Sequence, residues 1–132
     1  IFLDDKNDLI AANFEHLRDM GIDIEIDDFG TGYASIVSLI HLRPKRLKID
    51  RQLVITITHS EGQRRLVASI IEIGQSLGIK VVAEGVETEG QLEFLRQQHC
   101  DEIQGYYYAR PMPWADLVQF LNKRGQAACL QQ

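Results

Sequence analysis

The order of hydrophobic and polar residues predicts alternating helices and strands along the chain. From residue 8 to residue 20, apolar side chains recur at the spacing of a helix that buries one face. Residues 22–27 then alternate isoleucine with acidic residues, which is the period of a strand. The same reasoning predicts, in order, a helix over 34–42, a strand over 46–54 with an ambiguous end, a helix over 60–77, a strand over 79–87, a helix over 88–99, a strand over 102–109 and a helix that begins near Pro113.

Two of the predicted helices carry start signals in the sequence. Ser60 with Gln63, and Thr88 with Gln91, have the spacing of a capping box, in which each side chain bonds the backbone of the other residue. The helix over residues 60–77 has one apolar stripe, formed by Leu66, Ile70, Ile73 and Leu77. At the end of the chain, residues 126–132 are expected to form a loose tail.

The succession of elements indicates the α/β fold class. An initial helix is followed by four strand–helix units, and this order favours parallel strands joined by right-handed crossovers. The sequence contains no low-complexity segment, linker or long internal repeat. We therefore predict no internal domain boundary.

Polar residues gather toward the ends of the predicted strands. In parallel α/β folds the carboxyl ends of the strands carry the chemistry, because the loops there vary without disturbing the core. The polar residues are Asp27 and Asp28, Lys48 and Asp50, Glu84, and Gln104 near the middle of the last strand. The alternation predicts that four of them, Asp27, Lys48, Glu84 and Gln104, share one face, which would line a barrel interior or a crevice.

Each of these residues also has a simpler explanation. Two aspartates before a glycine are common turn chemistry, although adjacent carboxylates are also typical ligands of a divalent cation. Lys48 and Asp50 fit a solvated pair on a strand. Glu84 and Glu87 fit acids that interact favourably with a helix start. The residues taken singly leave these alternatives open.

Composition and charge limit the classes of function. The chain has 132 residues and a mass of 15.0 kDa, enough for one modest core. Its net charge of -5 argues against broad contact with DNA or RNA, which depends on clustered Lys and Arg. Cys100 and Cys129 have neither disulfide-framework nor zinc spacing, which favours a reducing setting. With no long apolar run and no signal-peptide pattern, we expect a cytoplasmic location, while a parent protein is free to carry a membrane anchor.

Four strings taken together are more specific than any single motif. The chain contains, in this order, DDFGTGY, LKIDR, VVAEGVET and QGYYYARP. Over residues 8–121 it closely resembles the EAL-domain family of cyclic di-GMP phosphodiesterases. The resemblance implies a TIM-like (β/α)8 barrel that hydrolyses one phosphodiester bond of cyclic di-GMP with two Mg or Mn ions.

The resemblance also implies roles for the polar residues. Asp27 and Asp28 are similar to the metal ligands of the family, with Asp27 shared between two ions, and Lys48 to the lysine that orients the attacking water or neutralises charge. The chemistry is reasonable, because two cations bound to an anionic phosphodiester lower the pKa of a shared water. Carboxylate and water ligands suit Mg or Mn, and no sulfur or imidazole set here favours zinc.

Further site residues follow from the same resemblance. Glu84 would act at the catalytic water, Glu87 would hold the adjoining loop, and Gln104 would lie beside the water. The loop over residues 29–33 is similar to the segment that couples metal, substrate and dimer contacts in the family. The other residues implied are Thr31 and Gly32 for loop support, and Tyr33, Arg110 and Pro111 for substrate binding.

The sequence departs from the family pattern in its extent. The EAL tripeptide is absent, as are the upstream glutamate and asparagine that complete the metal shell. We therefore interpret the chain as the C-terminal half of the barrel, and expect the 132 residues alone to hydrolyse little. Upstream sensory or diguanylate cyclase domains and a homodimer are the expected partners besides cyclic di-GMP. Two alternatives remain: a catalytically silent EAL domain that senses the nucleotide or binds a protein, and an unrelated metal-dependent barrel enzyme such as a lyase.

Glu25 is a smaller departure. It lies two residues before Asp27 on the same face, where family members generally carry a small residue. A carboxylate there needs a partner or a proton. Arg46, two residues before Lys48 on the next strand, is the expected partner. The simpler interpretation is that Glu25 only forms a structural ion pair with Arg46. The alternative is that Glu25 affects the metal site.

Overall fold

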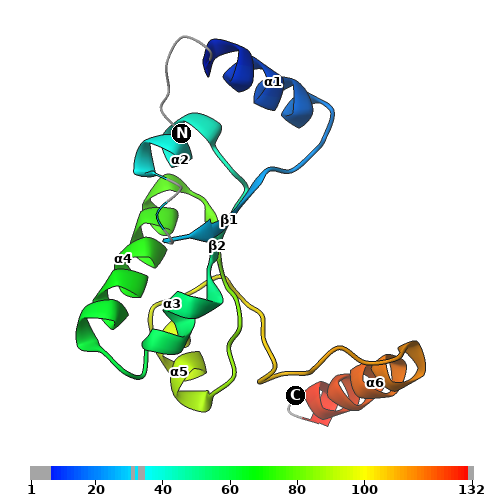
Figure 1. Ribbon diagram of the computed structural model, residues 1–132. Helices are drawn as coiled ribbons and strands as arrows, with labels where there is room; N and C mark the ends of the chain where they lie inside the picture. Colours follow the sequence, from blue (N-terminus) through cyan, green and yellow to red (C-terminus); the bar gives the residue numbers. More distant parts are fainter. Residues whose placement is uncertain (1–6, 31, 33–34, 131–132) are drawn as a thin grey trace.

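The computed structural model describes residues 7–30, 32 and 35–130. Its strands form one parallel sheet in the order β1-β2-β3-β4, so the predicted α/β alternation is confirmed (Figure 1). The strands are β1 (Glu25–Phe29), β2 (Arg46–Ile49), β3 (Lys80–Ala83) and β4 (Glu102–Ile103). The helices are α1 (Asn7–Asp19), α2 (Ile36–Leu42), α3 (Arg51–Thr56), α4 (Glu61–Leu77), α5 (Glu89–Gln97) and α6 (Trp114–Leu130).

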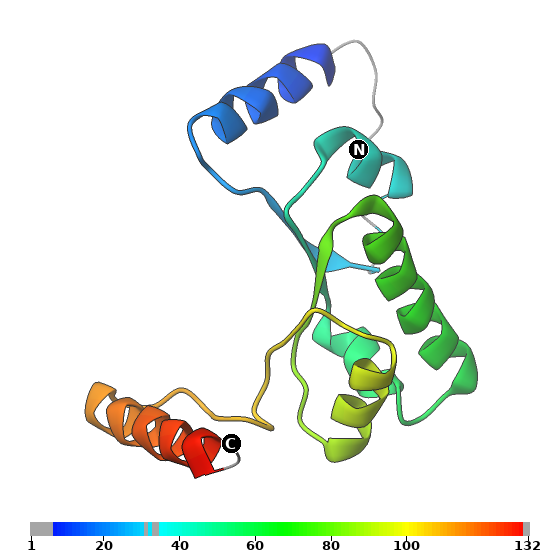
Figure 2. The same ribbon diagram turned by 180° about the vertical axis from the view of Figure 1, so that it is seen from behind.

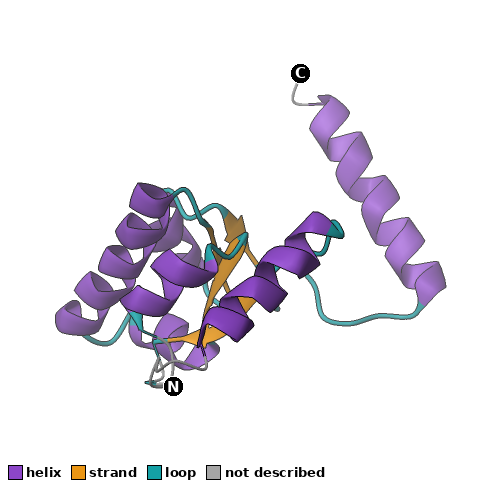
Figure 3. Cartoon of the chain, turned by 90° about the horizontal axis from the view of Figure 1, so that it is seen from above, coloured by secondary structure: helices purple, strands orange, loops and turns teal. Residues whose placement is uncertain are grey.

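The core lies between the sheet and the helices on one of its faces. On β2, Leu47 and Ile49 are fully buried, whereas Arg46 and Lys48 point to the other face and are half-buried. Helix α4 packs against β2 and β3 (Figure 2). In Figure 3 most helices lie on one side of the sheet, and α6 stands apart from the other elements. No helix in the described part of the chain is long and apolar enough to cross a membrane.

Three strands are shorter than predicted. The strand expected over 46–54 ends at Ile49, because Asp50 begins helix α3 by accepting a hydrogen bond from the Gln52 backbone N–H at 2.7 Å. The strand expected over 79–87 ends at Ala83. The strand expected over 102–109 ends at Ile103 and continues as turns. The first strand begins at Glu25 instead of residue 22.

One of the two predicted capping boxes forms. Thr88 and Gln91 bond each other's backbone at the start of α5. Ser60 precedes α4, but its side chain makes no capping hydrogen bond, so the box with Gln63 was wrong. Helix α6 continues through Leu130, so residues 126–130 are helical where a loose tail was expected.

The buried stripe of α4 is rotated from the predicted one. Leu66 and Leu77 are 46% and 41% exposed, so the predicted stripe was wrong at both ends. A Cβ on Gly74 would lie 2.2 Å from Val81 Cγ2, so the helix approaches β3 closely at this glycine. The buried row shares only Ile70 with the predicted stripe and consists of Val67, Ile70, Ile71 and Gly74.

Candidate metal centre

A bulge at the end of β1 brings two neighbouring carboxylates to the same place. The register with β2 shifts between Ile26 and Phe29, and Asp28 has a φ of 53°. Regular alternation would send Asp27 and Asp28 to opposite faces, but a bulge with a left-handed residue redirects the chain. The Asp28 backbone N–H donates to Asp27 Oδ1 at 2.9 Å, which fixes the orientation of that carboxylate.

Three carboxylates form an acidic cluster at this edge of the sheet. Asp27, Asp28 and Glu84 each offer one oxygen, and these oxygens lie within 4.8 Å of one another. The two aspartates are exposed and Glu84 is half-buried. The charge of Asp27, followed by desolvation and by the charges of Asp50 and Glu84, raises the pKa of Asp28. An all-carboxylate set under mutual repulsion fits a hard divalent cation such as Mg or Mn.

Lys48 joins this cluster from β2. Its Nζ lies 2.8 Å from Glu84 Oε1 and 3.9 Å from Asp27 Oδ2. The hydrogen bond to Glu84 is the main cause that raises the pKa of Lys48. The ammonium therefore keeps its charge at neutral pH and lies between the two acidic strand ends.

The loop that follows β3 is held by contacts from two helices. Gly85 has a φ of 70°, and a Cβ on it would lie 2.3 Å from Cγ of Arg51. Arg51 Nη2 donates to Glu87 Oε1 at 2.7 Å. The Gln91 side chain accepts hydrogen bonds from the backbone N–H groups of Glu87 and Thr88, at 2.8 and 3.1 Å. These contacts fix the segment that carries Glu84.

The structure brings together only part of the predicted site. Gln104 follows β4 and is exposed; its backbone N–H donates to the Ala83 carbonyl and its carbonyl accepts from Val86. The Arg110 guanidinium lies 5.3 Å from the centroid of the Tyr106 ring. Gly32 and Pro111 are exposed, and Gly32 has a φ of 107°. Thr31 and Tyr33 lie outside the described residues.

Sequence reasoning missed Arg51 and interpreted Asp50 only as part of a solvated strand pair. Asp50 adds to the charge that raises the pKa of Asp28, and Arg51 binds Glu87. Both come shortly after Lys48 in the LKIDR string. Their position just past a polar strand end was the available signal, but the predicted continuation of the strand concealed it.

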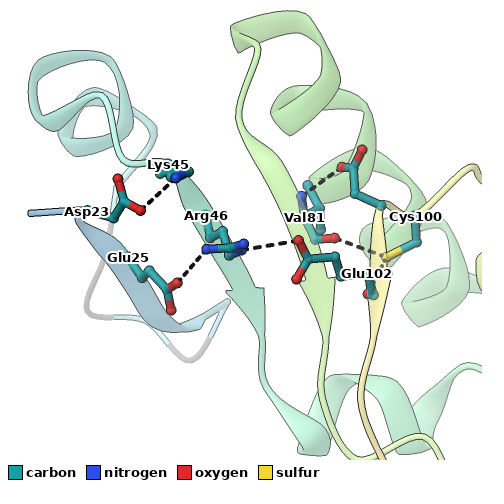
Figure 4. Close-up of polar contacts among 8 residues, drawn as sticks. Asp23, Glu25, Lys45, Arg46, Val81, Cys100 and Glu102 are labelled. Atoms are coloured by element: carbon teal, nitrogen blue, oxygen red, sulfur yellow. Dashed lines mark hydrogen bonds and ion pairs between the residues drawn. The ribbon is translucent and has the colours of Figure 1, made fainter. Parts of the chain in front are cut away.

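The predicted partner of Glu25 is confirmed. Arg46 Nη1 lies 3.1 Å from Glu25 Oε1, and its Nε lies 3.2 Å from Glu102 Oε1 on β4 (Figure 4). A separate exposed pair joins Lys45 to Asp23 at 2.6 Å. Arg46 therefore links three strands on the face that also carries Lys48.

A parallel α/β sheet with polar and charged side chains at the carboxyl ends of its strands places the chain in the class of α/β proteins whose sites lie at that edge. Within that class, residues 2–111 match the family described as EAL domain. The chain belongs to this family, and its four parallel strands and helices match part of the EAL barrel.

Two relatives whose names state an activity are similar to most of the chain. Cyclic di-GMP phosphodiesterase NbdA of Pseudomonas aeruginosa is 48% identical over 108 residues, which cover 82% of the chain and 14% of NbdA. MucR of the same species, named a bifunctional diguanylate cyclase/cyclic di-GMP phosphodiesterase, is 45% identical over 104 residues, covering 79% of the chain and 15% of MucR.

Two solved structures resemble the fold. The MucR phosphodiesterase in complex with c-di-GMP has a TM-score of 0.77 at 42% identity, covering 86% of this chain and 46% of that one. BlrP1 of Klebsiella pneumoniae, in a complex with manganese and cyclic di-GMP, has a TM-score of 0.71 at 36% identity, covering 77% of this chain and 26% of that one. The chain thus spans less than half of either solved chain.

Proposed function

We propose that the chain is the C-terminal half of an EAL domain that hydrolyses cyclic di-GMP with two Mg or Mn ions. The observation that carries this proposal is the cluster of Asp27, Asp28 and Glu84, with Lys48 beside it. The phosphodiesterase names of NbdA and MucR support the substrate. The manganese in the BlrP1 complex supports the choice of metal.

The bound ions would offset the charge of the phosphodiester and lower the pKa of the attacking water. Asp27 and Asp28 are the ligands that we assign from this chain. Lys48 remains protonated and supplies positive charge at the acidic edge, since Glu84 raises its pKa. Glu84 is assigned to accept or hold a proton of the attacking water. Gln104 is assigned beside that water.

The loop residues would keep this geometry. Glu87, held by Arg51 at 2.7 Å, and the buried Gln91 fix the segment that follows Glu84. Thr31 and Gly32 are assigned to support of the loop after Asp28. Arg110 and Pro111, with Tyr33, are assigned to contacts with the nucleotide, because an arginine beside an exposed aromatic ring suits an anionic base-bearing ligand.

The decisive experiment measures hydrolysis of cyclic di-GMP by the complete domain with Mg or Mn, beside an Asp27→Asn variant. Loss of a ligand charge should reduce turnover by at least about a hundredfold, because the ions stabilise the transition state by several kcal/mol. Asp23→Asn is the matched control, since Asp23 lies on the approach to the same strand and pairs with Lys45 away from the cluster. It should keep turnover within about twofold.

Two outcomes would contradict the proposal in different ways. Equal turnover by the Asp27→Asn variant would remove the assigned metal site. An unaltered domain that binds the nucleotide without hydrolysing it would favour a sensor. In the longer protein we propose sensory or diguanylate cyclase domains, for which the bifunctional name of MucR is the supporting observation, and a homodimer.

A further inference from the structure

Arg46 holds two carboxylates one layer before the candidate metal centre. Its guanidinium donates to Glu25 on β1 at 3.1 Å and to Glu102 on β4 at 3.2 Å (Figure 4). Because Arg46 belongs to β2, its side chain crosses β3 to reach Glu102. Val82, which is the register partner of Glu102 on β3, is 0% exposed.

Lys48 lies in the next layer of the same face, two residues further along β2. Its pairing with Glu84 at 2.8 Å is the shortest of its ion pairs, and Asp27 follows at 3.9 Å. Glu84 raises the pKa of Lys48 most, and the charges of Asp27 and Glu25 add to the effect. Glu25 therefore attracts the Lys48 ammonium, although its hydrogen bond goes to Arg46.

The two cations of β2 differ in what they can hold. The guanidinium of Arg46 is a rigid fork with five donors and binds two carboxylates at once. The ammonium of Lys48 is compact and sits on a flexible stem, so it turns toward the carboxylate that attracts it most. Without Arg46, Glu25 would lose its hydrogen-bonded partner and would compete with Glu84 for Lys48.

We propose that Arg46 is a positioning residue that, by holding Glu25, keeps Lys48 paired with Glu84 at the candidate metal centre. The effect on hydrolysis rests on the proposed function, whereas the pairing of Lys48 is measurable without it. While Arg46 holds Glu25, this carboxylate does not compete for Lys48 and leaves the site undisturbed.

The test compares Arg46→Met with the double variant Arg46→Met/Glu25→Gln in the complete domain. Methionine keeps an unbranched stem without the charge. We expect Arg46→Met to lower cyclic di-GMP turnover about tenfold, and the double variant to recover to within about twofold, because Glu25, the released carboxylate whose charge acts on Lys48, is gone. Lys45→Met is the matched control, since it removes the neighbouring cation and one unit of charge from an exposed pair. It should leave turnover unaltered.

The second readout is the nuclear magnetic resonance signal of the Lys48 ammonium, which is assigned by its absence in Lys48→Arg. This signal would not shift if Arg46 only stabilised the fold. In Arg46→Met this signal should shift as it does in Glu84→Gln, and it should return in the double variant. An unchanged Lys48 signal, or a double variant as slow as a folded Arg46→Met, would overturn the proposal.

Two further outcomes are also decisive. If Arg46→Met does not fold, Arg46→Lys and Arg46→Lys/Glu25→Gln replace it, because lysine keeps the charge without the fork. Identical Lys48 signals in these two variants and the unaltered protein would then overturn the proposal. If the unaltered domain does not hydrolyse cyclic di-GMP, the proposed function fails, while the Lys48 signal still decides the role of Arg46.

Discussion

At Gly85 the chain leaves β3 with a φ of 70°, and the aliphatic stem of Arg51 lies where a Cβ would be. Distances of 2.3 to 2.8 Å separate that position from Cβ, Cγ and Cδ of Arg51. The glycine therefore lets Arg51 pass over the loop and reach Glu87. The position of Glu84, the residue before Gly85, depends on this contact.

Gly85→Ala should reduce both the stability and the activity of the complete domain. The alanine Cβ would strain a left-handed residue and displace Arg51, at a cost of at least about 2 kcal/mol in the free energy of unfolding. Urea unfolding measures that loss, and cyclic di-GMP hydrolysis measures the displacement of Glu84. Gly78→Ala is the matched control, because Gly78 has a φ of 68° with nothing within 4 Å of a built Cβ.

The control separates backbone strain from the contact with Arg51. Gly78→Ala should cost about 1 kcal/mol in stability and leave hydrolysis unchanged. Equal effects of the two substitutions on stability and turnover would show that the contact between Gly85 and Arg51 does not position the loop.

The sequence predicted part of this site because period-two alternation needs only local information. It put Asp27, Lys48 and Glu84 on one face, and the structure brings their charged groups together. Asp28 breaks the alternation through a left-handed φ of 53°, which no hydrophobic pattern reveals. The predicted strand included Gln104, but β4 ends one residue earlier, at Ile103. Strand alternation therefore does not determine on which face Gln104 lies.

At the scale of elements, the two similar helix starts have different outcomes. Thr88 caps α5 by accepting from the Gln91 backbone N–H at 3.3 Å. Gln91 in turn is buried beneath the loop after β3, where it also binds Glu87. Ser60 has the same spacing to Gln63, but no capping bond forms. Gln91 thus also has a tertiary contact with the loop after β3, which the local sequence does not contain.

Thr88→Ala should lower the free energy of unfolding by about 1 kcal/mol, because the Gln91 backbone N–H loses its hydrogen-bond acceptor. Ser60→Ala should change it by less than about 0.5 kcal/mol, since its side chain makes no capping bond. Urea unfolding of the two variants measures the difference directly. A larger loss for Ser60→Ala would mean that the capping assignment at α4 is wrong.

The elements that sequence patterns misjudged are short ones with competing local chemistry. Leu53 and Val54 add apolar residues after β2, yet the Asp50 side chain accepts from the Gln52 backbone N–H and starts α3. After β4, Gly105 passes so close to Val86 that a Cβ would lie 2.1 Å from the Val86 carbonyl oxygen. The chain therefore turns over the preceding loop instead of extending through the tyrosines.

At the scale of the whole molecule, the sheet has two open edges and one uncovered face. In the described structure β1 pairs only with β2, and β4 only with β3. The face that carries Arg46 and Lys48 lies opposite the helical core. A closed barrel of this class needs eight strands, and the solved chain of the MucR phosphodiesterase is about twice as long as the part that the chain matches. These two facts support our proposal of a half-barrel.

The isolated 132 residues should therefore associate, bind metal weakly and hydrolyse little cyclic di-GMP. Open strand edges pair with other strands, and in the half-barrel that we propose the metal shell is incomplete. Sedimentation velocity measures the association, and titration with Mn measures the affinity. Co-expression with the other half of the domain should restore a single closed species, tighter Mn binding and turnover. Full turnover by the purified monomeric 132 residues would instead show that Asp27, Asp28, Lys48 and Glu84 suffice, and the half-barrel interpretation would fail.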